Sequence, residues 1–213
     1  MVKLIFSLLF ILYFPVFIKA DDKISLYDIH FNNSQIMSGF FYNNAHLTIG
    51  NIMYVFKKNT IVYFDGHGHI TTAYLAYDQT VNINGNKLKL KAVTINGIGN
   101  YNIAFHSNGL PRLVWLAENT ILKVGKKRYS FLGVKTYMPL ILDGQKQNPN
   151  NLVDPLETLE FYDDGTVRSG YIGEEITIMD YVIPVGSHII FTQSGTIEKY
   201  FDNLKDNYTT VTR

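Results

Sequence analysis

The chain has 213 residues, of which 46% are hydrophobic and 14% aromatic, and it contains no cysteine. This hydrophobic content excludes disorder of the whole chain, and the lack of cysteine excludes disulfides and thiol nucleophiles. Without the N-terminal segment that holds Lys3 and Lys19, 17 of the 19 basic residues remain against 18 acidic ones, and this net charge near −1 excludes a general affinity for nucleic acid.

Residues 1–20 have the pattern of a secretory signal peptide. Lys3 gives a basic start, residues 4–18 are almost wholly apolar, and Ala20 offers a small residue at a cleavage site. The apolar run of about fifteen residues is short for a membrane span, which needs about twenty, and Pro15 interrupts it. We therefore expect export with cleavage near Ala20, to the periplasm, the outer surface or the medium, and no transmembrane segment in the mature chain. A secreted chain without cysteine fits a bacterial envelope better than a eukaryotic secretory route.

Beyond residue 60 a heptapeptide recurs four times. Its copies are F-D-G-H-G-H-I from Phe64, F-H-S-N-G-L-P from Phe105, F-Y-D-D-G-T-V from Phe161 and F-T-Q-S-G-T-I from Phe191. Each copy has a phenylalanine, three residues typical of turns and a glycine. An aromatic residue follows six positions after the glycine, namely Tyr74, Trp115, Tyr171 and Phe201, and a weaker fifth copy begins at Asn32. Internal repetition of this kind predicts a repeat architecture.

The heptapeptide predicts a β-hairpin, as the copy around residues 162–166 illustrates. A three-residue loop made of a type I turn and a left-handed residue needs glycine at its last position, and Asp, Asn and Ser suit the positions before it. With this loop Tyr162 faces Thr166, and Phe161 faces Val167. Stacked hairpins are expected to align their aromatic rings into a ladder. Alternation along the strands predicts a buried face that contains Leu159, Phe161, Val167, Ser169 and Tyr171.

The copy that begins at Phe64 contains two histidines and an aspartate, which raises the question of a metal site. In the repeat alignment His67 occupies a loop position, Gly68 is the repeat glycine, and Asp65 and His69 flank the loop. The other copies carry no equivalent ligands, so turn geometry explains the motif without a metal. We therefore expect no metal and no cofactor, and an ion held by Asp65, His67 and His69 is the less favoured interpretation.

Further short strands are predicted between the hairpins. Asn82–Leu88 has the pattern of a tight Asn-Gly hairpin. Lys87–Lys91 alternates lysine with leucine, so one face of this strand is expected to be buried and the other solvated. Each unit is thus expected to have about thirty residues and three strands.

These features predict an all-β fold of tandem antiparallel β-hairpin repeats, each of about 30 residues, in an elongated sheet. A β-sandwich or a barrel is the alternative, since hairpin patterning does not decide how a sheet closes. A single domain is expected at 21–201, with units near 29–60, 61–100, 101–157, 158–188 and 189–201. Residues 133–155, rich in Asn, Gln, Pro and Gly, are expected to form an exposed insertion in the third unit, and residues 202–213 a polar tail.

The pattern F-x-x-x-G-x-I followed by an aromatic residue resembles MORN-like hairpin repeats, including those of exported bacterial proteins, over residues 29–201. The chain lacks the Tyr-x-Gly-x-Trp sequence and the repeated glycines of the usual MORN unit, and its own unit is longer. The resemblance implies an elongated antiparallel sheet of tandem hairpins that serves as a scaffold or a binding surface. It implies no catalytic residues.

The sequence was compared with three patterns that carry known chemistry. The patterns G-x-S-x-G, H-E-x-x-H and the P-loop are all absent. The pairs Asp163–Asp164 and Glu174–Glu175 have the residue types of a glycosidase site, but both fall in or beside predicted turns. Trp115 occupies a repeat tyrosine position and is expected in the core rather than on a sugar-binding surface.

We therefore expect a non-enzymatic, exported repeat protein of the bacterial cell envelope that acts in binding or structure. Its expected partner is a protein or an envelope glycan, and the sequence identifies no ligand-binding residue. Two alternatives remain open. One is a hydrolase or glycan-acting enzyme whose site is assembled from distant residues, and the other is a metal- or ligand-binding sensor that uses the histidine turn.

Overall fold

The computed structural model describes residues 24–92, 102–133, 158–178, 180–202 and 207–211, which form nineteen β-strands and no helix. The predicted all-β fold is therefore confirmed. The predicted signal peptide at 1–20 and residues 134–155 of the predicted insertion lie outside the described residues. Within the described part, no helix has the length and apolar character that crossing a membrane requires.

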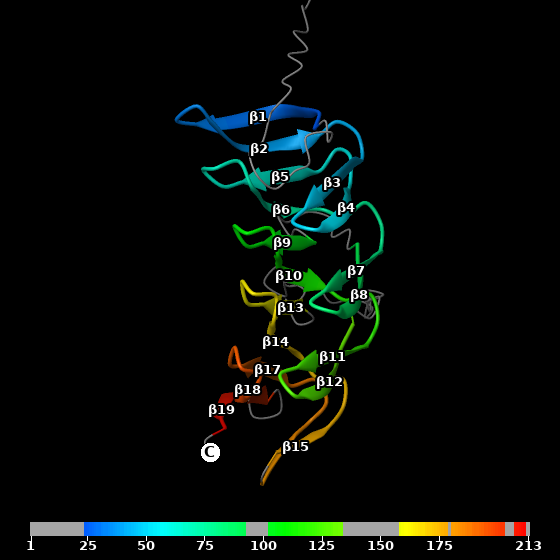
Figure 1. Ribbon diagram of the computed structural model, residues 1–213, viewed down its shortest axis with the longest axis vertical. Helices are drawn as coiled ribbons and strands as arrows, with labels where there is room; N and C mark the ends of the chain where they lie inside the picture. The colour runs from blue at the N-terminus through cyan, green and yellow to red at the C-terminus, as the bar shows by residue number, and fades with distance from the viewer. Residues whose placement is uncertain (1–23, 93–101, 134–157, 179, 203–206, 212–213) are drawn as a thin grey trace, which may run out of the picture.

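Eleven strands form one antiparallel sheet, the main sheet, in which spatial neighbours follow chain order (Figure 1). They are β1 (Leu26–Asn32), β2 (Gln35–Phe41), β5 (Ile61–Phe64), β6 (Ile70–Ala73), β9 (Ile103–Phe105), β10 (Pro111–Trp115), β13 (Thr158–Phe161), β14 (Val167–Tyr171), β17 (His188–Phe191), β18 (Ile197–Asp202) and β19 (Asn207–Thr210). The first and last of these each pair with a single neighbour, so the sheet is open. The elongated sheet is confirmed, and the barrel alternative is wrong.

Strand β19 lies within residues 202–213, where the sequence predicts a polar tail. Its backbone pairs with β18 from Asn207 opposite Asp202 to Thr210 opposite Lys199. The segment therefore contributes the last strand of the main sheet. Its polar composition does not prevent this, because backbone groups alone form the ladder.

Eight further strands form four separate two-stranded hairpins, the side hairpins. They are β3 (Ala45–Ile49) with β4 (Ile52–Phe56), β7 (Gln79–Ile83) with β8 (Asn86–Leu90), β11 (Thr120–Val124) with β12 (Lys127–Phe131), and β15 (Ile176–Ile178) with β16 (Tyr181–Ile183). In the chain, each side hairpin follows two paired strands of the main sheet. We call these two strands the sheet hairpin, and a sheet hairpin with the side hairpin after it forms one unit. Units 1 to 4 are therefore β1–β4, β5–β8, β9–β12 and β13–β16, and unit 5 is β17–β19. Three strands per unit is thus wrong for units 1 to 4, because the sequence between heptapeptides forms a complete second hairpin.

The turn of each heptapeptide has the predicted geometry. In the copy of unit 4 the Tyr162 backbone N–H donates to the Thr166 carbonyl, and the Gly165 N–H donates to the Tyr162 carbonyl (2.8 and 2.9 Å). The other three copies repeat both hydrogen bonds. The four glycines have φ between +78° and +87°, the left-handed region in which a Cβ is costly. Phe161 pairs with Val167 as predicted.

Just after each of these turns, the second strand of the sheet hairpin contains a β-bulge. Phe161 pairs with Val167, but Glu160 pairs with Ser169, so Arg168 has no partner on β13. The same register shift leaves out one residue in each of the other three copies, namely Thr71, Arg112 and Glu198. An inserted residue moves the later side chains of the strand to the opposite face of the sheet.

The prediction that Ser169 and Tyr171 share the buried face of Phe161 is therefore wrong. Between them Gly170 faces the core, since a Cβ there would lie 2.7 Å from the Phe131 ring. Ser169 is buried as predicted, but it donates a hydrogen bond from its hydroxyl to the Glu160 carboxylate on the other face (3.2 Å). We call this other face, opposite the side hairpins, the outer face of the main sheet.

The side hairpins form a second layer, and the turn of each of the first three contacts the sheet-hairpin turn two units later. The turn at Gly50 in unit 1 lies against Gly109 in unit 3, and the turn at Gly125 in unit 3 lies against Gly195 in unit 5. In unit 2 the Asn84 side chain donates a hydrogen bond to the Asp164 carbonyl in unit 4 (2.6 Å). These side hairpins thus lie beside the sheet hairpins of later units rather than beside their own (Figure 1).

The core lies between these two layers, and the ring contacts cross it. Phe105 packs against Tyr54 and Phe56 of the first side hairpin, with 5.3 and 6.3 Å between ring centroids. Phe191 packs in the same way against two aromatic residues of β12. The predicted ladder of rings along the sheet is wrong, because the repeat phenylalanines lie on every second strand. Their separation of about 10 Å exceeds the range of direct ring contact.

Replacing Tyr54 with phenylalanine is expected to leave the free energy of unfolding unchanged or to raise it by up to about 1 kcal/mol. Tyr54 is fully buried, and among the described residues its hydroxyl has no hydrogen-bond partner. Folding therefore removes this hydroxyl from water without compensation, and the same burial raises the pKa of the Tyr54 hydroxyl above its ordinary value. Urea denaturation of both proteins measures the difference. A loss of stability in the variant would contradict the expectation.

Candidate functional site

The histidine motif at residues 64–70 forms a hydrogen-bonded turn. One oxygen of the Asp65 carboxylate accepts hydrogen bonds from the backbone N–H groups of His67 and His69 (2.8 and 2.9 Å). The other oxygen lies 2.9 Å from Nδ1 of the His69 ring. Both oxygens are thus used within the turn. The described residues contain no group of three or more His, Asp or Glu side chains arranged to hold a metal ion.

Replacing Asp65 with asparagine is expected to make stability less sensitive to acid. Partial burial alone would raise the pKa of Asp65, but the backbone hydrogen bonds from His69 and His67 and the His69 side chain together lower it. Because the folded pKa is the lower one, the carboxylate stabilises the fold above its unfolded pKa of about 4. This contribution is lost as pH falls through the folded value.

The measurement is the free energy of unfolding from neutral pH down to about pH 2, and the wild type should lose more than Asp65→Asn over this range. Asp180→Asn, which changes an exposed aspartate in the turn between β15 and β16, is the matched control and should follow the wild type. Parallel curves for all three proteins would show that the Asp65 turn makes no such contribution.

The carboxylate pairs considered for acid–base chemistry lie in separate turns. Asp164 is bonded within its own turn, where one oxygen accepts from the backbone N–H and the hydroxyl of Thr166 (2.8 and 2.6 Å). These bonds, with one from Gln193, lower the pKa of Asp164. Glu174 follows β14, and its carboxylate accepts a bond from the backbone N–H of Ser130 (3.4 Å). Trp115 is only 8% exposed, as expected for a core side chain.

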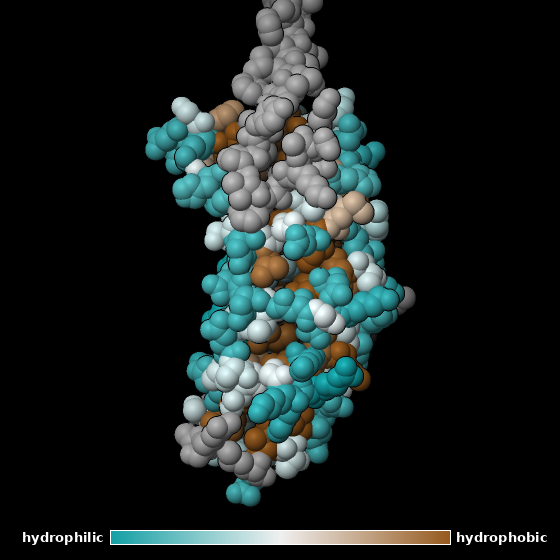
Figure 2. All heavy atoms as spheres, viewed as in Figure 1, coloured by the Kyte–Doolittle hydropathy of each residue, from teal (hydrophilic) through white to brown (hydrophobic). Residues whose placement is uncertain are grey.

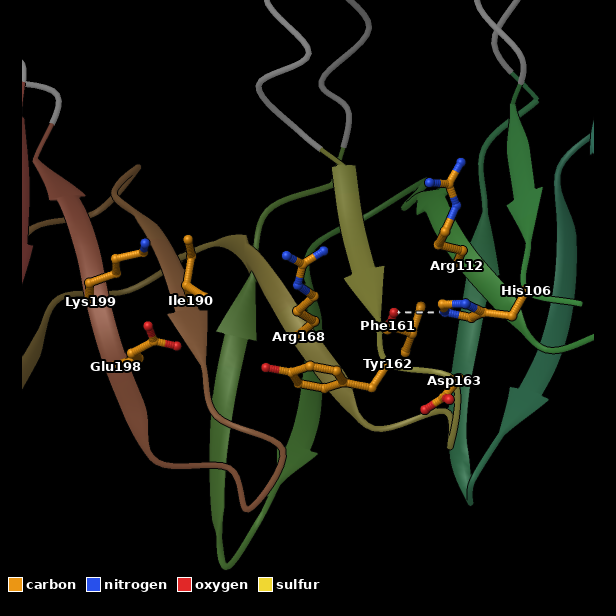
Figure 3. Close-up of a pocket in the computed structure, with 9 residues that line it drawn as sticks. All are labelled: His106, Arg112, Phe161, Tyr162, Asp163, Arg168, Ile190, Glu198 and Lys199. Carbon is orange, nitrogen blue, oxygen red and sulfur yellow. Dashed lines mark hydrogen bonds between the residues drawn. The ribbon is translucent and has the colours of Figure 1, made fainter. Parts of the chain in front are cut away.

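An open groove of about 510 Å³ crosses the outer face of the main sheet (Figure 3). Units 3, 4 and 5 all contribute to it. Its lining residues are His106, Arg112, Phe161, Tyr162, Asp163, Arg168, Ile190, Glu198 and Lys199. The groove therefore runs across the strands rather than along one of them.

The groove forms because neighbouring sheet hairpins separate near their turns. Pairing of β10 with β13 ends at Leu113 opposite Glu160, and pairing of β14 with β17 ends at Ser169 opposite Ile190. The bulges occur at this level, and a bulge increases the local twist of a strand. The ladder thus stops before the turns and leaves space between successive hairpins.

Side chains of one unit bridge this space to the backbone of the next. Nε2 of His106 lies 3.0 Å from the carbonyl oxygen of Phe161, and the Tyr162 hydroxyl donates to the carbonyl oxygen of Phe191 (2.6 Å). Both donors follow a repeat phenylalanine, and both acceptors are the phenylalanine of the following unit. The floor of the groove is therefore held by the same contact at two successive unit boundaries.

The cations of the groove come from equivalent repeat positions. Arg112 and Arg168 are the unpaired bulge residues of units 3 and 4, and their side chains lie on either side of β13 (Figure 3). Arg112 is exposed, with no ion pair or hydrogen bond to any described residue. Arg168 lies 3.4 Å from Glu160, with both side chains partly exposed, and such a pair contributes little. Both guanidinium groups are therefore accessible to a ligand.

Reasoning from the sequence did not identify these groove residues as a site. The signal was present, because Arg112 and Arg168 both lie three positions after the repeat glycine. Strict alternation of side chains along a strand, however, places each arginine and the residue after it on opposite faces of the sheet. This rule does not allow for a bulge. Only the register shift shows that the arginines project at the point where the hairpins separate.

Comparison of the chain with protein-family models, with curated proteins and with solved structures finds no match in any of the three groups. The resemblance to MORN-like repeats thus rests on the residue pattern alone. The function has to be argued from the geometry of the described residues.

Proposed function

We propose that the chain is an exported, non-enzymatic repeat protein of the bacterial envelope that binds its partner with the outer face of the main sheet. The observation that carries this proposal is the asymmetry of the sheet. One face is covered by the side hairpins, whereas the other carries the groove with its accessible arginines. Figure 2 shows an elongated body on which hydrophobic side chains are visible along the middle, with hydrophilic ones between them and on both sides.

The state of the polar side chains supports binding over catalysis. Four side chains with acid–base chemistry, Asp65, Asp164, His106 and Tyr162, are bonded into turns or across unit boundaries. A catalytic acid or base needs instead a side chain free to exchange a proton with a substrate. The resemblance to MORN-like repeats agrees with this proposal, since it implies a scaffold or binding surface.

Export is the second part of the proposal, and it is supported by the pattern of residues 1–20. N-terminal sequencing of the protein recovered from the envelope or medium of its source tests it. The expected first residue is Asp21. A chain that retains the first twenty residues in the cytoplasm would overturn export.

The binding role is tested by affinity capture from the envelope fraction of the source organism. The tagged mature protein is compared with the double variant Arg112→Glu/Arg168→Glu and with Arg128→Glu, which alters an exposed arginine on β12 outside the groove. A component retained by the wild type and the control but lost by the double variant supports the proposal. Equal retention by all three proteins, or no retention by any, would count against a binding role for this face.

A further inference from the structure

The two groove arginines are separated along the sheet by one intervening strand. Arg112 belongs to β10 and Arg168 to β14, with β13 between them. Strands lie about 4.8 Å apart, so the two positions are about 10 Å apart along the sheet. Lys199 on β18 continues the cationic line by one more hairpin. A ligand that meets all three must therefore carry anionic groups at wide, regular intervals.

The acidic side chains of the groove narrow the ligand class further. Asp163 and Glu198 lie in the same groove as the three cations. Carboxylates accept hydrogen bonds from hydroxyl groups but repel a closely charged polyanion. Nucleic acid carries a phosphate about every 3.4 Å along each strand, so much of its charge would face these carboxylates. Anionic groups separated by hydroxyl-bearing segments fit the lining better.

A peptide ligand fits less well for two reasons. The strands around the groove are interior strands of the main sheet, so none offers a free edge to which a peptide could add as a further strand. An extended peptide also repeats its side chains on one face about every 7 Å, which does not match cations about 10 Å apart. Few apolar side chains line the groove to anchor a peptide, since Ile190 is its aliphatic member and Phe161, whose side chain is buried in the core, contributes its carbonyl oxygen.

We infer that the groove binds an acidic polysaccharide in which carboxylate-bearing rings alternate with neutral rings, lying across β10, β13, β14, β17 and β18. Arg112 and Arg168 hold successive carboxylates, for which the planar guanidinium suits bidentate hydrogen bonding. Asp163 and Glu198 accept hydrogen bonds from ring hydroxyls, and the Tyr162 ring offers an apolar surface to a sugar face. This inference rests on the proposed function, because it names the ligand class of the same face.

The test uses titration calorimetry of the mature protein with a hyaluronan octasaccharide, in which glucuronate alternates with a neutral ring. The comparison ligands are the same octasaccharide with its carboxylates reduced to alcohols, poly-glutamate and inorganic polyphosphate. The proteins are the wild type, Arg112→Gln, Arg168→Gln, their double variant, and Arg128→Gln as the matched surface control. Thermal unfolding of each variant verifies that it is folded.

The expected result is binding of the acidic octasaccharide that weakens as salt is added, with no binding of the reduced form. Each single groove variant should lose roughly tenfold in affinity, the order of one charge-assisted bidentate contact, and Arg128→Gln should lose none. Four results would each overturn the inference. They are absence of binding to the acidic octasaccharide, equal binding of the reduced form, tighter binding of poly-glutamate or polyphosphate, and unchanged binding by the folded double variant. If envelope capture depends on the arginines while the octasaccharide fails to bind, only the glycan inference falls and the proposed function stands.

Discussion

Replacing Phe191 with alanine is expected to lower the free energy of unfolding by about 3–5 kcal/mol, the usual cost of removing a large aromatic side chain from a core. Phe191 has no exposed surface, and its ring contacts Tyr129 and Phe131 at 5.1 and 6.1 Å between centroids. Its side chain therefore joins the main sheet of unit 5 to the side hairpin of unit 3. Truncation leaves a cavity between the layers, where two rings lose their partner.

Urea denaturation followed by far-UV circular dichroism and by fluorescence of the single tryptophan, Trp115, measures this loss. Phe31→Ala is the matched control, because Phe31 lies in β1 with 55% of its surface exposed and its truncation should cost less than about 0.5 kcal/mol. Similar losses in the two variants would contradict a core that lies between the main sheet and the side hairpins.

Replacing Gly195 with alanine is expected to destabilise the protein more than replacing Gly85, although both glycines have nearly the same backbone conformation. Their φ values are +83° and +77°, so in each case a side chain costs about 1–2 kcal/mol for the left-handed conformation. A Cβ on Gly195 would also lie 2.6 Å from the Gly125 Cα and 2.8 Å from the Val124 carbonyl carbon. These are backbone atoms of another turn, so the contact has to separate, at a further cost of about 1–3 kcal/mol.

Gly85→Ala is the control for this prediction, because no heavy atom lies within 4 Å of the Cβ position there. The difference in free energy of unfolding between the two variants isolates the packing of the unit 3 side-hairpin turn on the unit 5 sheet turn. Equal losses would mean that these turns do not contact each other in solution.

The local part of the fold could be predicted from the sequence because it depends on short-range chemistry. The turn between Phe161 and Val167 follows from a glycine that must adopt positive φ and from turn-forming residues before it. The β7–β8 hairpin follows from Asn84-Gly85 and from the alternation of Leu88 and Leu90 with lysine, and these two leucines are fully buried.

The parts that could not be predicted depend on non-local packing. Nothing in the residues near Arg168 marks a bulge, because Val167, Arg168 and Ser169 also read as a regular alternating strand. The contact of one turn with another two units away has no local signal either. The groove needs both features, so its arginines could be recognised as equivalent in sequence but not as neighbours around one site.

The contact of side-hairpin turns with sheet turns two units later has a consequence for how the molecule unfolds. In solenoids whose units touch only their immediate neighbours, the ends fray independently and the array melts in stages. Here the end of a side hairpin pairs with the chain just after the sheet hairpin of the next unit, as Phe56 pairs with Leu75. The turn of the side hairpin contacts the unit after that one. The side hairpin of unit 1 therefore spans the boundary between units 2 and 3, and the side hairpin of unit 2 spans the boundary between units 3 and 4. The interior of the array is therefore expected to melt cooperatively.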